Sequence, residues 1–433
     1  MKYLAHYIAY YGSVLLPIIV SALLFFTIPQ SSHRSTVLSI VKVLWFASGL
    51  YVAANVLGFI TGSPWHHERR NHVTWDISKH LRLVYVSRGQ NDKALARAIT
   101  ASRKVLDASG IPYSIEAITD IPVTVGADQH VIVPAAYATI KGAKYKARAL
   151  HYASVQRAAS IDTWLLHMDE ESMITQAAIQ GIAKFIASGD IIRIGQGEIQ
   201  YNGHGYGKNF LITAADAVRT GDDLGRFRLQ YALFKRPLFG MHGSYFVVHS
   251  LVEKRIGFDL GGRGSITEDA YFALKCSQRG VKFDWINGSI REQSPFTIGD
   301  LLKQRRRWMN GLQLLIMDKT VSLKQRFPLG LALILSQIAW LGLMVTIYNF
   351  FSGGSHIPFV LAYIAELMAG SIVSVYLVGA YRNVASADIP VWHKVLIWIY
   401  SGLLVPVSCL IEAVAIIYAV TRPVQDFQIV AKN

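Results

Sequence analysis

The sequence predicts an α/β domain with a mostly parallel sheet, inserted between helices that span a membrane. Three observations support this prediction: an apolar composition, a gathering of apolar residues toward both chain ends, and alternating strand and helix patterns in the middle. The 433 residues are 52% hydrophobic and only 16% charged, whereas soluble globular chains are about 25% charged. The predicted divisions are two N-terminal spans in 1–62, a soluble domain in 63–327, about three C-terminal spans in 328–421 and a tail at 422–433.

Five apolar stretches are long enough to cross a bilayer, because a spanning helix needs roughly 20 apolar residues. The acidic residues within them are Glu366 and Glu412, which either mark a polar passage or form hydrogen bonds between helices. Five spans from a cytoplasmic N-terminus put the weakly basic tail outside, so one segment is alternatively re-entrant or interfacial. The stretches are residues 5–28, 43–61, 328–351, 357–380 and 395–420.

The basic excess favours a multi-pass integral membrane protein whose soluble domain is cytoplasmic. The net charge is +15, and basic residues flank the domain at 66–70, Lys324 and Arg326. Basic residues beside spans are typical of the cytoplasmic side of a bilayer. The two cysteines, Cys276 and Cys409, fall in the domain and in a predicted span, which excludes a disulfide framework.

Strand patterns alternate with helix patterns through the first half of the soluble domain. This alternation implies a mostly parallel sheet with helices on both faces. Ligands bind such sheets beyond the carboxyl ends of the strands, which here are 87–89, 119–120 and 168–171. The expected strands are 81–87, 113–119, 131–135 and 161–168, and the expected helices are 93–109, 144–158 and 172–188.

Two groups of acids stand at positions where chemistry is possible. The acids at 169–171 directly follow an apolar strand, and they repel one another unless a cation is present. Oxygen ligands of this kind suit Mg²⁺ or Mn²⁺ shared with substrate phosphates. The alternative is a helix start that Ser172 caps, since acids favour helix N-termini. Glu268 and Asp269 also precede a helix pattern, and either catalysis or capping explains them.

The stretch KQRRRWMNG at 303–311 concentrates positive charge beside an aromatic ring. One interpretation is a juxtamembrane basic patch attracted to anionic lipid. On a helix, however, Gln304, Arg307 and Trp308 share one face because they are spaced i, i+3 and i+4. An amide, a guanidinium and an indole suit a phosphate next to a sugar, since arginine pairs with phosphate oxygens.

These elements, in this order, resemble the processive and related inverting glycosyltransferases of family 2, which include cellulose, chitin and hyaluronan synthases. Shorter stretches are most similar to the egghead-type β-1,4-mannosyltransferase branch, and the resemblance covers nearly the whole chain. The family's acid, DxD-type, TED and QxxRW motifs correspond to Asp120, Asp169-Glu170-Glu171, Thr267-Glu268-Asp269 and Gln304-Arg305-Arg306-Arg307-Trp308. The branch-like stretches are YVSRG (85–89), KARAL (146–150), GQGEIQY (195–201) and SPFTIGDLLKQRRRW (294–308).

The resemblance implies a Rossmann-like GT-A domain that binds a nucleotide-sugar donor. In that pattern Asp120 contacts the nucleobase and Lys146 lies near the nucleotide phosphates. Asp169 approaches the donor sugar and, with Glu171, takes the position of the Mg²⁺ or Mn²⁺ ligands. The third acid of this motif is a glutamate here and not an aspartate, so the resemblance does not fix the exact ligation of the metal.

The resemblance also implies the roles of the later motifs. Asp269 is the expected catalytic base, with Glu268 beside it. Arg307 and Gln304 are expected to hold the diphosphate, and Trp308 is expected to form the floor of the acceptor subsite.

Two weaker features allow a functional and a structural interpretation each. The five glycines within 195–207 predict either a flexible segment that gates the donor or a plain surface hairpin. His242, next to Gly243 in FGMHGSY, either lines the acceptor pocket or is structural.

The leading hypothesis is a membrane-embedded inverting hexosyltransferase with a cytoplasmic active site. It moves a hexose, with GDP-mannose favoured as donor, to a glycolipid or a growing glycan and forms a β-linkage. The alternative within this class is a processive UDP-sugar polysaccharide synthase that also translocates its polymer. A non-catalytic export or scaffold protein is less compatible with the intact acid set and QxxRW motif. A nucleic-acid partner is not expected despite the basic net charge, because acids cluster at the strand ends and five spans are predicted.

Overall fold

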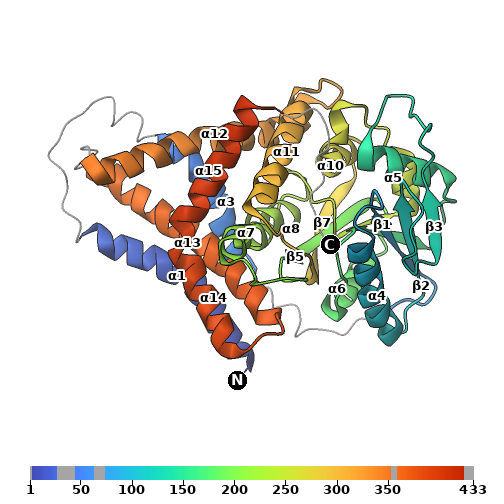
Figure 1. The fold of residues 1–433 in the computed structure, drawn as a ribbon, viewed down its shortest axis with the longest axis horizontal. Helices are drawn as coiled ribbons and strands as arrows, with labels where there is room; N and C mark the ends of the chain where they lie inside the picture. Colours follow the sequence, from blue (N-terminus) through green and yellow to red (C-terminus); the bar gives the residue numbers. More distant parts are fainter. Residues whose placement is uncertain (1, 27–43, 63–73, 353–357, 424–433) are drawn as a thin grey trace. The chain divides into compact units, whose positions relative to one another are not determined.

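The computed structural model describes residues 2–26, 44–62, 74–352 and 358–423, which form two compact units (Figure 1). The helical unit comprises the described residues of Met1–Ser63, Thr213–Leu229 and Gly330–Ala413. The sheet unit comprises those of Pro64–Ile212, Gln230–Leu329 and Val414–Asn433. The basic run at 66–70 and most of the predicted tail lie outside the described residues.

Within the described part of the sheet unit, seven strands form one sheet in the order β3-β2-β1-β4-β6-β5-β7. β6 pairs antiparallel with β4 and β5, and the other pairs are parallel. The predicted α/β class with a mostly parallel sheet is therefore confirmed. The strands are β1 (His80–Val86), β2 (Tyr113–Thr119), β3 (Gln129–Ile132), β4 (Thr163–Asp169), β5 (Arg193–Gln200), β6 (Phe246–His249) and β7 (Lys282–Arg291).

Helices cover both faces of this sheet, as the alternating patterns predict. On one face, α4 (Asp92–Ser109) and α6 (Gln176–Ile186) bury their apolar sides against alternate residues of the strands. On the other face, α5 (Tyr145–Gln156) contacts β1 and β2, and α9 (Ser250–Ile256) contacts β4. Each helix has an apolar stripe that needs such a partner, because burial of apolar surface drives the packing.

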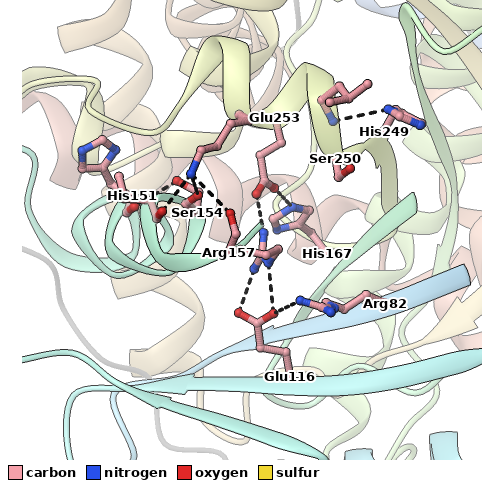
Figure 2. A network of polar contacts seen from close by, with 12 residues as sticks. Arg82, Glu116, His151, Ser154, Arg157, His167, His249, Ser250 and Glu253 are labelled. Atoms are coloured by element: carbon pink, nitrogen blue, oxygen red, sulfur yellow. Dashed lines mark hydrogen bonds and ion pairs between the residues drawn. The ribbon is translucent and has the colours of Figure 1, made fainter. Parts of the chain in front are cut away.

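The face under α5 and α9 also encloses a buried network of charges (Figure 2). The Arg157 guanidinium bonds Glu116 of β2 at 2.8 Å and Glu253 of α9 at 2.5 Å. Glu253 in turn lies 2.6 Å from the Nε2 atom of His167 on β4, and Arg82 of β1 reaches Glu116 at 3.4 Å. The network therefore joins three strands to α9. Its member on β4, His167, lies two residues before the carboxyl end of that strand.

The helical unit contains the candidate membrane spans. α1 packs along α13, where Ser374 donates a hydrogen bond to the Val14 carbonyl at 2.7 Å. Gly370 permits the close approach, because a Cβ there would lie 2.7 Å from the Pro17 carbonyl oxygen. Its helices are α1 (Lys2–Phe25), α3 (Gly49–Ile60), most of α12 (Leu323–Ser352), α13 (Phe359–Ser386), α14 (Val391–Leu403) and the first half of α15 (Val405–Thr421).

By length and composition, the described residues provide two helices that can cross a membrane, Leu4–Phe25 and Phe359–Ser386. A third is available if α14 and α15, bent by 60° at their junction, cross together. The apolar helix Leu44–Ile60 is shorter. The predicted count of five spans therefore remains a prediction.

One internal segment joins the helical unit although its sequence resembles that of a soluble helix. Residues 213–229 cover most of α7 (Phe210–Asp222) and the π-helical turn η2 (Asp223–Phe227). Asn55 of α3 donates to Asp222 at 3.1 Å and accepts from the backbone N–H of Arg226 at 3.0 Å. On composition alone, the charged residues of this segment place it in the predicted 63–327 domain. Its partner Asn55 on α3 is distant in the sequence, so composition does not show that the segment packs in the helical unit. The predicted boundaries remain a prediction, since compactness does not mark where a membrane begins.

Candidate active site

The strand register brings the polar ends of β1, β2 and β4 to one edge of the sheet. Val86 pairs with Ile118 on one side and with Asp169 on the other. Because these strands are parallel, the residues that follow them lie side by side. The edge thus presents Ser87, Asp120 and Asp169, as the sequence predicts.

Lys146, in the first turn of α5, connects three separate motifs at this edge. Its Nζ atom donates to Asp169 Oδ1 at 2.5 Å and to the Gly243 carbonyl at 3.1 Å, and it lies 3.3 Å from Glu268 Oε1. Burial disfavours the charged ammonium, but Asp169 and Glu268 outweigh this effect and raise the pKa of Lys146. The side chain is therefore a fixed positive charge among carboxylates.

Glu268 and Asp269 open α10 (Glu268–Gln278), and both carboxylates lie beside Gly243, where a Cβ would be 3.4 and 3.1 Å from their oxygens. The Asp269 Oδ1 atom accepts a hydrogen bond from the Ala270 N–H at 2.7 Å, in the first turn of the helix. Burial, together with the adjacent Glu268, raises the pKa of Asp269 to about 7, while Lys146 opposes the shift. A carboxyl with a pKa close to neutrality is suited to accept and release a proton.

Arg307 lies on α11 (Ile298–Met317) and interacts with the same acids. Burial lowers the pKa of its guanidinium, and the carboxylates Glu268, Asp169, Asp269 and Glu171 oppose that shift. The structure thus brings two cations and four acids together, although they come from four regions of the sequence. Such an arrangement is able to receive a charged diphosphate between Lys146 and Arg307.

The cations of the 303–311 stretch diverge around α11. Arg305 donates to Gln304 Oε1 at 3.2 Å, and its guanidinium lies 4.9 Å from the centre of the Trp308 ring. Arg306 donates to the Arg422 carbonyl at 2.7 Å. Arg305 therefore connects the amide and the indole that share the predicted face, and Arg306 anchors the far side of α11.

Asp120 is held at the end of β2 by arginine side chains. Arg148 of α5 donates to its Oδ1 atom at 2.6 Å, and Arg88 Nε lies 3.8 Å from Oδ2. Arg148 also donates to the Pro134 and Tyr137 carbonyls at 3.1 and 3.3 Å. The arginine of the KARAL stretch thus fixes the carboxylate and the loop beside it.

Glu170 has a role that the sequence did not indicate. It accepts a short hydrogen bond from the Ser87 hydroxyl and one of 2.5 Å from the Asn91 amide. Ser87 also accepts the N–H of Gly89, whose φ of +87° favours glycine. Glu170 therefore ties the turn after β1 to the acids after β4, and adjacency to Asp169 was its only signal in the sequence.

The prediction of a flexible segment or a surface hairpin is wrong for Gly195 and Gly197, which belong to the buried strand β5. A Cβ at Gly197 would lie 2.1 Å from the Tyr245 ring, so the absence of a side chain makes room for that ring. The backbone N–H of His242 donates a hydrogen bond to the side chain of Gln196, also on β5, at 3.3 Å. The charge of His242 also opposes the rise in the pKa of Asp269, which places it near the acid pair.

The oxygen-rich donor set suits a hard divalent cation. Among the described residues, no group of three or more His, Cys, Asp or Glu side chains is arranged to hold a metal ion. Asp169 and Glu171 nevertheless both lie within the electrostatic reach of Arg307. Mg²⁺ is commonly held by one or two carboxylates together with substrate phosphates, so these two acids fit such an ion once a diphosphate is present.

Comparison with protein families identifies the family of this chain. Residues 164–420, more than half of the chain, match the model described as glycosyl transferase family group 2. The chain belongs to this family. The matched part contains the acids after β4, the pair at the start of α10 and the basic face of α11. The predicted membership in glycosyltransferase family 2 is therefore confirmed.

Two relatives of this glycosyltransferase are named β-1,4-mannosyltransferases. The β-1,4-mannosyltransferase egh of Drosophila melanogaster is 30% identical over 76% of this chain and 72% of its own length. The β-1,4-mannosyltransferase bre-3 of Caenorhabditis briggsae is 36% identical over 57% of this chain and 55% of its own length. The chain is thus an enzyme of a transferase family, as predicted, and its relatives carry the name of mannosyltransferases.

Solved structures of related shape are more distant. The mannosyltransferase PcManGT from Pyrobaculum calidifontis, solved in complex with GDP-Man and Mn²⁺, is 12% identical over 79% of this chain and 98% of its own, with a TM-score of 0.43. S. aureus TarS 1–349 in complex with UDP is 13% identical over 81% of this chain and 94% of its own, with a TM-score of 0.36.

Proposed function

We propose that this glycosyltransferase moves mannose from GDP-mannose to a glycolipid or glycan acceptor and forms a β-linkage. The observation that carries the proposal is the convergence of Lys146 and Arg307 on the acids Asp169, Glu268 and Asp269. The names of its relatives support mannose as the sugar. The domain around this site is proposed to be of the GT-A type.

Asp269 acts as the base in the proposed reaction. It accepts the proton of the acceptor hydroxyl as the hydroxyl oxygen attacks the anomeric carbon, and the bond from that carbon to the diphosphate breaks. Attack from the face opposite the diphosphate inverts the anomeric centre, so an α-linked donor gives a β product. One base is sufficient. Glu268 helps to keep the pKa of Asp269 high and pairs with Lys146.

Lys146 and Arg307 hold the leaving diphosphate from two sides. Positive groups fixed where negative charge develops stabilise the transition state more than the ground state. Asp169 and Glu171 would hold a Mg²⁺ or Mn²⁺ ion, which would neutralise further charge on the diphosphate. Gln304 supports this diphosphate site from α11.

The remaining predicted residues divide between the two substrates. Asp120, at the end of β2, recognises the nucleobase of the donor. Trp308 offers an apolar ring to the acceptor sugar, and Arg305 behind it fixes the orientation of the indole. His242 lines the acceptor side beside Asp269.

We further propose that the enzyme is a multi-pass membrane protein whose site faces the cytoplasm. The long apolar helices α1 and α13 support membrane insertion. The basic residues Lys324 and Arg326 at the start of α12 support the orientation. A lipid-bound acceptor then reaches the site from the bilayer in which the enzyme resides.

The test is a donor comparison with the full-length enzyme in membranes. Labelled GDP-mannose, UDP-glucose and UDP-N-acetylglucosamine are supplied separately, and label is measured in extracted lipid and in high-mass polymer. Label from GDP-mannose in lipid or short glycans, lost with excess EDTA and restored by Mn²⁺, supports the proposal. Label from a UDP-sugar in polymer identifies a processive synthase instead, and the absence of transfer from all three donors overturns the proposal.

A further inference from the structure

The turn from Phe239 to Tyr245, which we call the 239–245 turn, leads into β6 and carries unusual backbone geometry. Gly240 has a φ of +92°, and Tyr245 has a φ of +53°. A positive φ is rare for a bulky residue such as tyrosine and persists only where the surroundings impose it. The contacts that impose it are therefore informative about the purpose of the turn.

Two buried glutamines hold this turn at its two ends, each as a donor and as an acceptor. Gln230 donates to the Gly240 carbonyl at 2.8 Å and accepts the Phe239 N–H at 2.6 Å. Gln196 of β5 donates to the His242 carbonyl at 3.2 Å and accepts the His242 N–H at 3.3 Å. Both side chains are fully buried, with 0% exposure.

Gln196 has additional support at the end of the turn that faces the acids. Its amide also lies 3.5 Å from the Ser244 carbonyl. The neighbouring Gly197 leaves the space that the Tyr245 ring occupies. The GQ pair of the GQGEIQY stretch thus fixes the backbone from His242 to Tyr245 from below.

The part of the turn that Gln196 fixes lies against the reacting groups. The Gly243 carbonyl accepts the Lys146 ammonium at 3.1 Å. A Cβ at Gly243 would lie 3.1 Å from Asp269 Oδ2 and 3.4 Å from Glu268 Oε1. The backbone of Gly243 is thus the neighbour of the carboxylate oxygen that the Ala270 N–H does not occupy, and a shift of this backbone closes or opens the space beside that oxygen.

We propose that Gln196 is a positioning residue for sugar transfer, because it fixes Gly243 so that an acceptor hydroxyl reaches Asp269 Oδ2. The inference rests on the proposed function, in which Asp269 is the base. Gln230 anchors the opposite end of the turn, at Phe239 and Gly240, and provides a matched control. Both residues are buried glutamines that bond the same turn, and they differ in whether the bonded backbone touches the site.

The experiment compares Gln196→Met with Gln230→Met in the full-length enzyme, with GDP-mannose as donor. Gln196→Met is expected to lower kcat about 10- to 100-fold, since displacement of a reacting group by about 1 Å costs this much. The Kd for GDP is expected to stay within about twofold, because Asp169 and Glu268 still hold Lys146 in the variant. Gln230→Met is expected to lower the Tm by about as much as Gln196→Met does, and to keep kcat within about threefold of wild type.

Gln196→Glu refines the comparison, because it keeps the acceptor for the His242 N–H and loses the two donated bonds. Its kcat should lie between those of wild type and Gln196→Met. If Gln196→Met does not fold, Gln196→Glu against Gln230→Glu carries the test in the same way. Wild-type kcat in the Gln196 variants, or an equal loss of kcat in both glutamine pairs, overturns the inference. A wild-type enzyme without transfer activity contradicts the proposed function instead.

Discussion

At the scale of single residues, a lysine and a carboxyl pair set the character of this site. The Lys146 ammonium touches Asp169 and the Gly243 carbonyl and lies close to Glu268. Burial and the like charge of Glu268 both disfavour the ionised form of Asp269, so the pKa of this carboxyl is raised to about 7. The acid whose pKa is raised is the one that we propose as the base.

Replacing Asp269 by asparagine should abolish transfer and leave donor binding nearly intact. Removal of a general base costs about 10²- to 10⁴-fold in rate, and asparagine preserves the shape of the side chain. Measuring kcat and the Kd for GDP-mannose checks this expectation. Asp162→Asn is a suitable control, since that half-exposed carboxylate pairs with Lys79 at the opposite end of β4. Activity of Asp269→Asn equal to wild type would exclude its role as base.

The rate should also depend on pH through Asp269. Its pKa of about 7 means that the carboxyl is increasingly protonated below neutrality. A protonated carboxyl cannot accept a proton, so kcat should fall as the pH falls through about 7. Glu268→Gln removes a negative neighbour that raises this pKa, so the acidic limb of the kcat profile should move to lower pH. An unchanged limb in Glu268→Gln would refute the proposed coupling of the two acids.

At the scale of elements, a buried charge network secures the strands that carry the site. Figure 2 shows Arg157 between Glu116 and Glu253, with His167 and Arg82 at its edges. The side chains of Arg157, Glu116 and Glu253 are 6%, 3% and 3% exposed. Buried charges are costly unless paired, so this network fixes β1, β2 and β4 in one arrangement with α9. The carboxyl ends of the same strands present Asp120 and Asp169.

Arg157→Met should destabilise the protein strongly, because it leaves the buried Glu253 without its arginine and Glu116 with only the more distant Arg82. Breaking a buried ion pair costs about 3–5 kcal/mol, equivalent to a fall in Tm of about 10 °C for a unit of this size. Thermal unfolding of the full-length protein in detergent measures the change. Arg103→Met is the control, since Arg103 and Asp128 are about one third exposed and such surface pairs contribute about 1 kcal/mol or less. Similar Tm losses in both variants would contradict this account of the network.

At the scale of the whole molecule, charge and hydrophobicity are divided between the two compact units. The sheet unit holds the acids and cations of the site, and the helical unit holds α1 and α13. The internal segment 213–229 belongs to the helical unit although it lies between β5 and β6 in the sequence. The helical unit is therefore assembled from three separate parts of the sequence, one of which interrupts the sheet unit.

The intact protein should remain in the membrane fraction after an alkaline carbonate wash. Helices such as Leu4–Phe25 and Phe359–Ser386 are long and apolar enough to span a bilayer, and high pH removes proteins that are held only by surface charge. Immunoblotting of pellet and supernatant measures the distribution. Release of the full-length chain into the supernatant would show that it is not integral to the bilayer.

Much of the sheet followed from the sequence because local patterns dictate local structure. The predicted strands and helices between 81 and 188 are present with ends that differ by a few residues. Glycines misled the prediction at 195–197, because a glycine in a strand and a glycine in a loop look alike without the neighbour it accommodates. The Tyr245 ring is that neighbour, and it lies 48 residues further along the chain.

The sequence alone determined the order of the motifs, the α/β class and the apolar stretches, because composition and periodicity are local properties of the chain. Only the tertiary structure decided which charges meet. It placed Lys146 between Asp169 and Glu268, gave Glu170 and Gln196 their partners, and joined residues 213–229 to the helical unit. Those outcomes depend on strand register and helix packing, which bring distant residues within a few ångströms and which no local pattern encodes.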